Sequence, residues 1–211
     1  QYEENPYPRW LNTNLNMKPL SIKQLIASLD LRLLKSDVSF SASPKILVAG
    51  CGTGQHSILT SRRFENSQIT AVDITLSSLS YAKRKTREFG IKNINYMQAD
   101  ILDLHDFGKT FDVIESVGVL HHMADPIKGW KILVDLLKPG GLMKIGIYSE
   151  NNRRHVVRAR DIIAKLDISS DRNSMLEFRN KIITTSDKLL FSLVSEDDFY
   201  STSNLRDLIF H

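Results

Sequence analysis

The feature that most constrains this chain is the segment from residue 46 to residue 55, ILVAGCGTGQ, where an apolar run leads directly into closely spaced glycines. The run Ile46–Ala49 is typical of a parallel strand buried on both faces. The glycines at positions 50, 52 and 54 allow backbone angles closed to other residues and a close approach to a ligand. A helical stretch follows from about His56, so the turn would present a ligand to unpaired N–H groups at a helix N-terminus.

The spacing of these glycines distinguishes between classes of nucleotide site. The dinucleotide fingerprint G-x-G-x-x-G/A requires Gly or Ala at position 55, where this chain has Gln55, and this disfavours an NAD-dependent dehydrogenase. The Gly-Lys-Ser/Thr of a phosphate-binding loop is absent. An ordinary tight connection between a strand and a helix would explain the turn equally well, so its meaning depends on the strands and acids later in the chain.

Strand and helix patterns alternate through residues 45–148. Apolar runs at 68–72, 94–98, 111–116 and 142–148 predict further strands, with helical spacing at 57–64, 77–89 and 130–137 between them. The sequence Lys-Pro-Gly-Gly at 138–141 predicts a turn before the last strand. We therefore expect an α/β fold with a doubly wound, mostly parallel sheet. Asp73 follows the second strand and Asp100 the third, so both acids should lie at the edge that carries the glycine turn.

The segments GCGTG, AVD, QADI, FDVI…VLHHM and LKPGGLMKI occur in this order, and together they resemble class I S-adenosylmethionine (SAM) methyltransferases. The resemblance covers residues 45–148. It implies a Rossmann-like SAM-binding core with SAM as cofactor and S-adenosylhomocysteine as product. The glycines would border the methionine part of SAM, Asp73 its ribose, and Asp100 and Ile101 its adenine. The implied cofactor-binding residues are Gly50, Cys51, Gly52, Gly54, Asp73, Ile74, Asp100, Ile101, Ser116 and Val117.

The chain departs from the family pattern at two places. The family often has an acid two residues before the first motif glycine, which would help to hold the methionine amino group through the loop; this chain has Val48 there. The family's sheet usually ends with an antiparallel sixth and seventh strand, which the sequence up to His211 does not reveal.

Residues outside the core suggest where a methyl acceptor would bind. His121 and His122 follow the fourth strand, where either could act as a general base or orient the acceptor, or form an ordinary loop hydrogen bond. We expect Tyr7, Trp10, Tyr148 and Asn151 to line the acceptor pocket or a lid.

Residues 1–44 are interpreted as an N-terminal lid segment and a helix over 19–34 with Ser21 as its N-cap. The alternative for Trp10 is a static anchor in the core. The lead YEENPYPRW is similar to that of certain bacterial class I methyltransferases, some of them fused to tetratricopeptide repeats. Residues 149–211 are expected to form a helical cap, with helices over 153–166, 171–184 and 205–210 and a further helix start at 195–198. We expect the three parts to form one compact domain.

Composition restricts the partners, the cysteine chemistry and the cellular location that the sequence predicts. The 211 residues carry a net charge of +4 with a pI of about 9.1, and the basic runs lack interleaved aromatics, which disfavours nucleic acid as a partner. The single cysteine, Cys51, permits no internal disulfide and fits a small filler better than a nucleophile. We expect a cytoplasmic protein without a signal peptide, a membrane segment or a metal site, and a chain that is part of something longer.

These observations favour a SAM-dependent methyltransferase acting on a small molecule. Two alternatives stay open: an enzyme that methylates protein or RNA, and a SAM-binding regulatory module without catalysis. The sequence predicts neither the acceptor's nucleophilic atom nor the oligomeric state.

Overall fold

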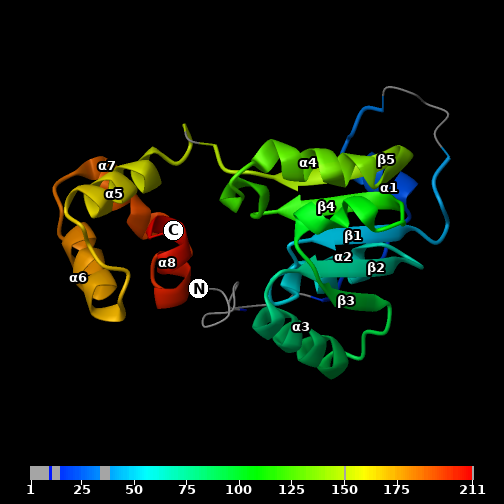
Figure 1. The fold of residues 1–211 in the computed structure, drawn as a ribbon, viewed down its shortest axis with the longest axis horizontal. Helices are drawn as coiled ribbons and strands as arrows, with labels where there is room; N and C mark the ends of the chain where they lie inside the picture. Colours follow the sequence, from blue (N-terminus) through cyan, green and yellow to red (C-terminus); the bar gives the residue numbers. More distant parts are fainter. Residues whose placement is uncertain (1–9, 11–14, 34–38, 150, 211) are drawn as a thin grey trace. The chain divides into compact units, whose positions relative to one another are not determined.

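A computed structural model describes residues 10, 15–33, 39–149 and 151–210. Tyr7 lies outside the described residues. The internal contacts of the chain divide it into two compact units, the first ending at Ile147 and the second beginning at Tyr148. Figure 1 shows that the first unit contains the sheet and that the second is helical.

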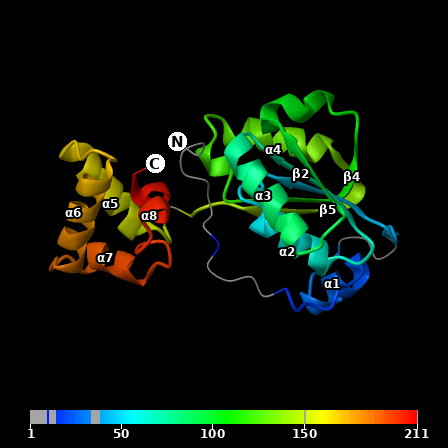
Figure 2. The ribbon, with the colours of Figure 1, turned by 90° about the horizontal axis from the view of Figure 1, so that it is seen from below.

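The first unit is built on a five-stranded parallel sheet with strand order β3-β2-β1-β4-β5 (Figures 1 and 2). The strands are β1 (Lys45–Ala49), β2 (Gln68–Asp73), β3 (Ile94–Gln98), β4 (Phe111–Val117) and β5 (Leu137–Gly146). The chain runs outward from β1 to β3 and then returns to the other side of β1. The order thus reverses between β1 and β4, the place where open α/β sheets form their ligand crevice. The predicted doubly wound fold is confirmed.

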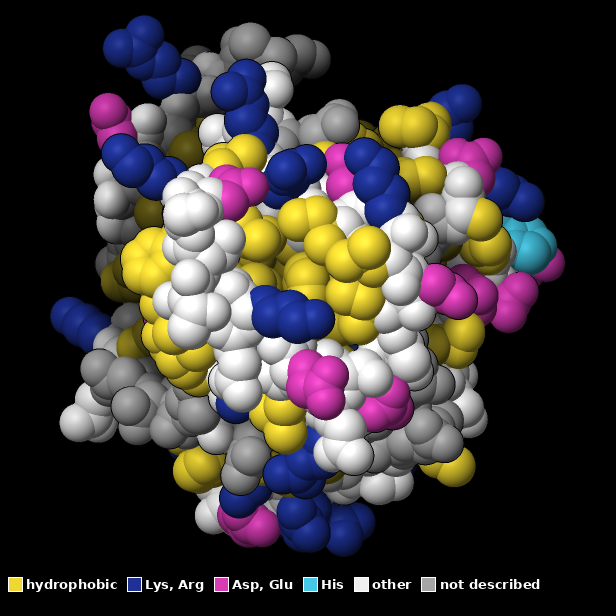
Figure 3. Space-filling model, turned by 90° about the vertical axis from the view of Figure 1, so that its left-hand side faces the viewer, with side chains coloured by type: hydrophobic (Ala, Val, Ile, Leu, Met, Phe, Trp, Pro, Cys, Tyr) yellow, Lys and Arg dark blue, Asp and Glu magenta, His cyan; other side chains and the backbone are white. Residues whose placement is uncertain are grey.

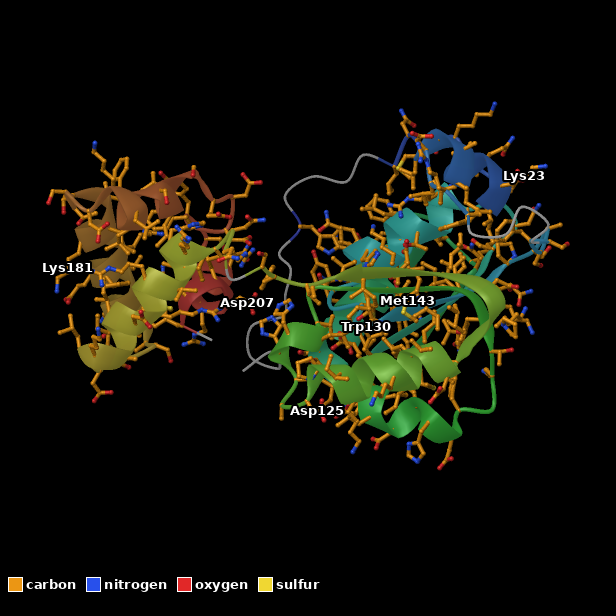
Figure 4. The ribbon with its side chains drawn as sticks, turned by 90° about the horizontal axis from the view of Figure 1, so that it is seen from above. Lys23, Asp125, Trp130, Met143, Lys181 and Asp207 are labelled. Atoms are coloured by element: carbon orange, nitrogen blue, oxygen red, sulfur yellow. The ribbon has the colours of Figure 1, made fainter. Side chains whose placement is uncertain are left out.

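The helices of the first unit connect these strands, except α1, which precedes β1. They are α1 (Ile22–Ser28), α2 (Gln55–Arg63), α3 (Leu76–Glu88) and α4 (Pro126–Asp135), with short 3₁₀ turns η1 (Ile101–Asp106) and η2 (Leu120–His122). The alternating side chains of β1 separate two cores. Ile46 and Val48 belong to a cluster shared with α1 and α3. Leu47 and Ala49 belong to another, shared with η1 and α4, against which Trp130 and Met143 also pack (Figure 4). Burial on both faces explains why the strand sequence is continuously apolar.

Three predicted boundaries in this unit are wrong. The helix expected over 19–34 is confined to Ile22–Ser28; Ser21 caps it as predicted, but Asp30 takes a φ of +49°, which turns the chain out of the helix. The helix expected over 130–137 starts earlier, at Pro126, with Asp125 as its N-cap. Residues 138–141 lie inside β5 as an irregularity, because the pairing with β4 shifts between Phe111 and Val113.

The second unit contains α5 (Arg154–Lys165), α6 (Arg172–Ile183), α7 (Lys188–Phe191), η3 (Ser192–Ser195) and α8 (Thr202–Ile209). These elements share a core of their own, in which Phe199 and Leu205 are fully buried. The helix start predicted at 195–198 is wrong: Ser195 ends η3, and Asp198 accepts a hydrogen bond from the Asn204 side chain at 2.8 Å. Figure 3, which looks onto this unit, shows apolar side chains gathered among Lys and Arg.

Candidate cofactor site

The turn after β1 is held in a conformation that requires glycine. Gly50, Gly52 and Gly54 have φ angles of +75°, +52° and +90°, a region that residues with a Cβ rarely adopt. A Cβ on Gly50 would lie 2.3 Å from Val119 Cγ2, and one on Gly54 would lie 2.6 Å from Ala82 Cβ. The turn therefore depends on glycine for its backbone angles and for its close packing.

Asp73 ties this turn to the end of β2. Its Oδ2 accepts a hydrogen bond from the Gly52 N–H at 2.7 Å, and its Oδ1 accepts one from the Thr75 N–H at 2.9 Å. An ionised carboxylate has about four lone-pair sites, so these two bonds leave capacity for ribose hydroxyls. Asp73 thus shapes the turn in addition to the ribose contact that the sequence predicts for it.

Asp100 and Ile101, predicted to hold adenine, and the neighbouring cofactor candidate Ile74 differ in how exposed they are. Asp100 caps η1 by accepting from the Leu102 N–H at 2.9 Å. Ile101 is only 6% exposed and belongs to the core under η1. Ile74, by contrast, is 60% exposed where β2 has ended. Ile74 therefore offers more apolar surface to a flat ring than Ile101 does.

The end of β4 combines an apolar surface with a buried hydroxyl. Val117 is 40% exposed, whereas Ser116 is fully buried. Within the described residues, the Ser116 Oγ has no hydrogen-bond partner. Buried hydroxyl groups are normally bonded to protein, water or ligand. This unsatisfied hydroxyl lies one position beyond the Val48–Glu115 pair, where β1 leads into the glycine turn, and it fits a polar ligand with an apolar part, as SAM is.

Trp10, in the N-terminal segment, forms a hydrogen bond with the glycine turn. Its indole N–H donates to Thr53 Oγ1 at 2.9 Å. Its ring stacks on Phe89 with centroids 5.9 Å apart and meets Tyr81 edge-on at 5.8 Å. Cys51, in the same turn, is buried, and burial raises the pKa of its thiol, which opposes a nucleophilic role.

The candidates for acceptor chemistry fall in both units. His121 and His122 lie side by side in η2, with ring centroids 4.1 Å apart, and both are half-buried. Tyr148 and Asn151 belong to the second unit. The Arg153 guanidinium lies 3.3 Å from the centroid of the Tyr148 ring, and burial raises the pKa of that phenol. Asn151 is exposed in a turn.

A residue that the sequence reasoning missed is Glu115, a buried acid on β4. Its carboxylate contacts His56, Thr60 and Arg63 of α2. Burial alone would raise its pKa, but the close His56 side chain, the hydrogen bond from Thr60 and the charges of His56 and Arg63 outweigh this, and the pKa falls to about 2. The signal was present in the sequence as one acid inside the strand segment VIESV.

Two negative findings apply to the described part of the chain. No group of three His, Cys, Asp or Glu side chains there could hold a metal ion. Among the same residues, no helix has the length and apolar character needed to cross a bilayer.

Comparison with known proteins identifies the core. A family model described as a methyltransferase domain matches residues 46–141, which span the glycine turn, Asp73, Asp100 and the end of β4. The first unit contains a class I SAM-dependent methyltransferase domain. SAM is the cofactor of this domain. The glycine turn and the acids at the strand ends thus belong to a domain that binds SAM.

Relatives of the methyltransferase domain include proteins of known and unknown role. An uncharacterised protein of Synechococcus sp. is 36% identical over 124 residues, which cover 58% of this chain and 30% of that protein. A ubiquinone biosynthesis O-methyltransferase of Coxiella burnetii is 29% identical over 147 residues, covering 70% of this chain and 60% of that enzyme. The chain thus spans between about a third and three fifths of the length of these two relatives.

Two solved structures share the fold. PKMT2 from Rickettsia typhi in complex with AdoHcy superposes with a TM-score of 0.55 at 23% identity, covering 74% of this chain and 33% of that one. The YcgJ protein of Bacillus subtilis superposes with a TM-score of 0.54 at 17% identity, covering 73% of this chain and 83% of that one. At these identities the likeness concerns the fold.

Proposed function

We propose that the protein transfers the methyl group of SAM to a small-molecule acceptor. The observation that carries the proposal is the carboxyl edge of the sheet, where the glycine turn, Asp73 and the buried Ser116 hydroxyl accompany the His121–His122 pair. The ubiquinone biosynthesis O-methyltransferase among the relatives supports an acceptor of low molecular mass. The expected cytoplasmic location is part of the same proposal.

The proposal gives the residues of the edge separate roles. Gly50, Gly52 and Gly54 accommodate the amino-acid part of the cofactor, Asp73 accepts from the ribose hydroxyls, and Ile74 packs on the adenine. Bound SAM supplies a methyl group that its sulfonium already activates. The chain's own residues then have to align the acceptor and exclude water, and alignment alone can lower a barrier by about 7–11 kcal/mol in favourable cases.

His121 and His122 are the proposed contacts to the acceptor. A neutral imidazole nitrogen can take a proton from a hydroxyl or amine, and an imidazole N–H can orient an oxygen. A base is required only where the acceptor is protonated at neutral pH. The helices of the second unit are proposed to set acceptor specificity.

A methyl-transfer assay tests the proposal. The chain would be incubated with SAM labelled in its methyl group and with panels of phenols, carboxylates and amines, of peptides, and of RNA. Labelled small molecules are expected, and His121→Ala or His122→Ala should lower kcat for a hydroxyl acceptor at least tenfold. His105→Ala is the matched control, because His105 is an exposed histidine on η1 that pairs with Asp106.

The alternatives give different results in the same assay. Label in peptides or RNA but in no small molecule would contradict the acceptor class. Binding of S-adenosylhomocysteine without any transfer across the panels would favour the regulatory module over the enzyme.

A further inference from the structure

The carboxylate of Glu115 is a buried charge that the proposed methyl transfer does not use. Glu115 is 2% exposed on β4. Its Oε1 lies 3.1 Å from an Arg63 guanidinium nitrogen and its Oε2 lies 3.0 Å from His56 Nε2. The Thr60 hydroxyl donates a hydrogen bond to Oε2. An isolated buried charge is costly, so these contacts are what permit an ionised acid in the strand.

All three partners lie on α2, the helix that follows the glycine turn. Residues 56, 60 and 63 are four and three positions apart, which places them on one face of the helix along almost its whole length. The helix begins at Gln55, directly after Gly54. Glu115 therefore fixes α2 to β4 from the first turn of the helix to the last, and the start of α2 forms the end of the glycine turn.

We propose that Glu115 is a positioning residue for the cofactor site, which holds α2, and through it the glycine turn, in place for the amino-acid part of SAM. The inference rests on the proposed placement of that part of the cofactor at the glycine turn. Asp73, proposed for the ribose, ends β2, and Ile74, proposed for the adenine, follows it. The Asp73 carboxylate accepts from the Gly52 and Thr75 N–H groups, not from the side chains that surround Glu115. Loss of the Glu115 charge should therefore affect one end of the cofactor more than the other.

The sheet register adds a second argument. Glu115 on β4 is directly paired with Val48 on β1 in a parallel ladder. Paired positions of neighbouring strands point to the same face of a sheet and lie about 4.8 Å apart. A carboxylate at position 48 would thus face the same helix. The acid that the family resemblance predicts at this position is replaced by Val48, and the neighbouring strand supplies one.

Binding of two ligands separates a positioning role from a general loss of stability. S-adenosylhomocysteine carries adenine, ribose and an amino-acid part, whereas 5′-methylthioadenosine lacks the amino-acid part. In Glu115→Gln, calorimetry should show affinity for S-adenosylhomocysteine reduced roughly tenfold, with the affinity for 5′-methylthioadenosine changed less than about twofold. Thermal melting without ligand shows whether the variant is folded.

Asp112→Asn is the matched control. Asp112 is a carboxylate on the same strand, at the end away from the glycine turn, where it accepts from the Lys45 N–H and from Lys138 Nζ, both at 2.8 Å. This variant should leave the ratio of the two affinities as in the wild type. A Glu115→Gln variant that weakens both ligands equally, or neither, overturns the inference. Failure of the wild type to bind S-adenosylhomocysteine would instead contradict the cofactor site itself.

A double variant that moves the carboxylate from position 115 to position 48 tests the inference if Glu115→Gln does not fold. In Val48→Glu combined with Glu115→Val, the carboxylate moves to the neighbouring strand on the same face. If Glu115 acts by holding α2, this variant should fold and bind S-adenosylhomocysteine more tightly than Glu115→Val alone. A double variant that folds without this gain, or one that does not fold, overturns the inference.

Discussion

Replacing Gly54 by alanine tests whether the turn requires glycine for the reasons that its geometry gives. Gly54 has a φ of +90° and a ψ of 0°, and a Cβ there would lie 2.6 Å from Ala82 Cβ and 3.0 Å from Ala82 Cα. The left-handed backbone costs about 1–2 kcal/mol for a residue with a Cβ. Forcing a methyl group into packed surroundings adds about 1–3 kcal/mol. Gly54→Ala should therefore lower the free energy of unfolding by about 2–5 kcal/mol.

Gly108→Ala separates the two contributions. Gly108 has a φ of +63°, but nothing lies within 4 Å of a Cβ built on it. The Gly108→Ala variant should therefore lose only the free energy of the strained backbone, about 1–2 kcal/mol. The smaller conformational freedom of the unfolded alanine chain applies to both variants and cancels in their difference. Urea denaturation of both variants gives the two free energies. S-adenosylhomocysteine titration should show weaker binding only for Gly54→Ala.

An equal loss of stability in the two variants would refute the packing argument, because the close approach of α3 to the turn would then contribute nothing. Equal stability of Gly54→Ala and wild type would refute the backbone argument as well. A loss beyond about 5 kcal/mol would reach the whole stability of many domains and would appear as an unfolded protein.

Three further predictions concern the same unit. Asp73→Ala should weaken SAM binding by roughly tenfold to a hundredfold in calorimetry, since hydrogen bonds to a charged group contribute about 1.5–3 kcal/mol; a folded variant with unchanged affinity would remove Asp73 from the site. Deleting residues 1–10 should lower the melting temperature without ligand more than deleting residues 1–9, because only the longer deletion removes the hydrogen bond from Trp10 to Thr53. If residues 1–9 act as a lid, the shorter deletion should weaken SAM binding and leave the melting temperature unchanged. Folding lowers the pKa of Glu115 from 4.5 to about 2, so its charge stabilises the fold by about 3 kcal/mol above pH 4.5, and this contribution is lost as the pH falls toward 2. The difference in unfolding free energy between wild type and Glu115→Gln should therefore narrow by about 1 kcal/mol between pH 6 and pH 3.5. A difference that stays constant over this range would contradict the assigned charge.

The sheet could be predicted from the sequence because each central strand is buried on both faces. Ile46–Ala49 must be apolar at every position for that reason, and this leaves a run that no amphipathic helix would show. The acids and glycines at the strand ends were equally visible, since they stand directly after such runs. These two signals together give the fold class and the edge that carries the cofactor site.

Local composition could not predict where α1 ends or how far β5 extends. Lys-Pro-Gly-Gly at 138–141 has the composition of a turn, but the neighbouring β4 keeps the segment in the sheet as an irregularity of β5. Asp30 takes a φ of +49°, a region that aspartate visits more often than most residues, and that angle ends the path expected for α1. At residues 138–141 the pairing with β4 decides the conformation, whereas at Asp30 the chain closes a local helix cap in which the Leu31 N–H donates to the Ile26 carbonyl at 3.1 Å.

Exposure at the site also depends on packing that the sequence does not reveal. Ile74 and Ile101 both follow a strand-end acid, and the sequence assigns the adenine contact to Ile101. The structure buries Ile101 in the core under η1 and leaves Ile74 exposed. The partners of Glu115 were hidden for a similar reason, because β4 and α2 are separated by about fifty residues in the chain and meet only once β1 and β4 pair.

The glycine turn is a flexible sequence held by polar contacts from three other parts of the first unit. Asp73 binds the Gly52 N–H from β2, Trp10 binds Thr53 from the N-terminal segment, and Glu115 holds the following helix from β4. Glycine-rich loops lose much conformational entropy when they order, and a loop ordered only by its ligand would subtract that cost from binding. Because these contacts already fix the turn without a ligand, the binding energy of the amino-acid part of SAM is available for affinity and alignment.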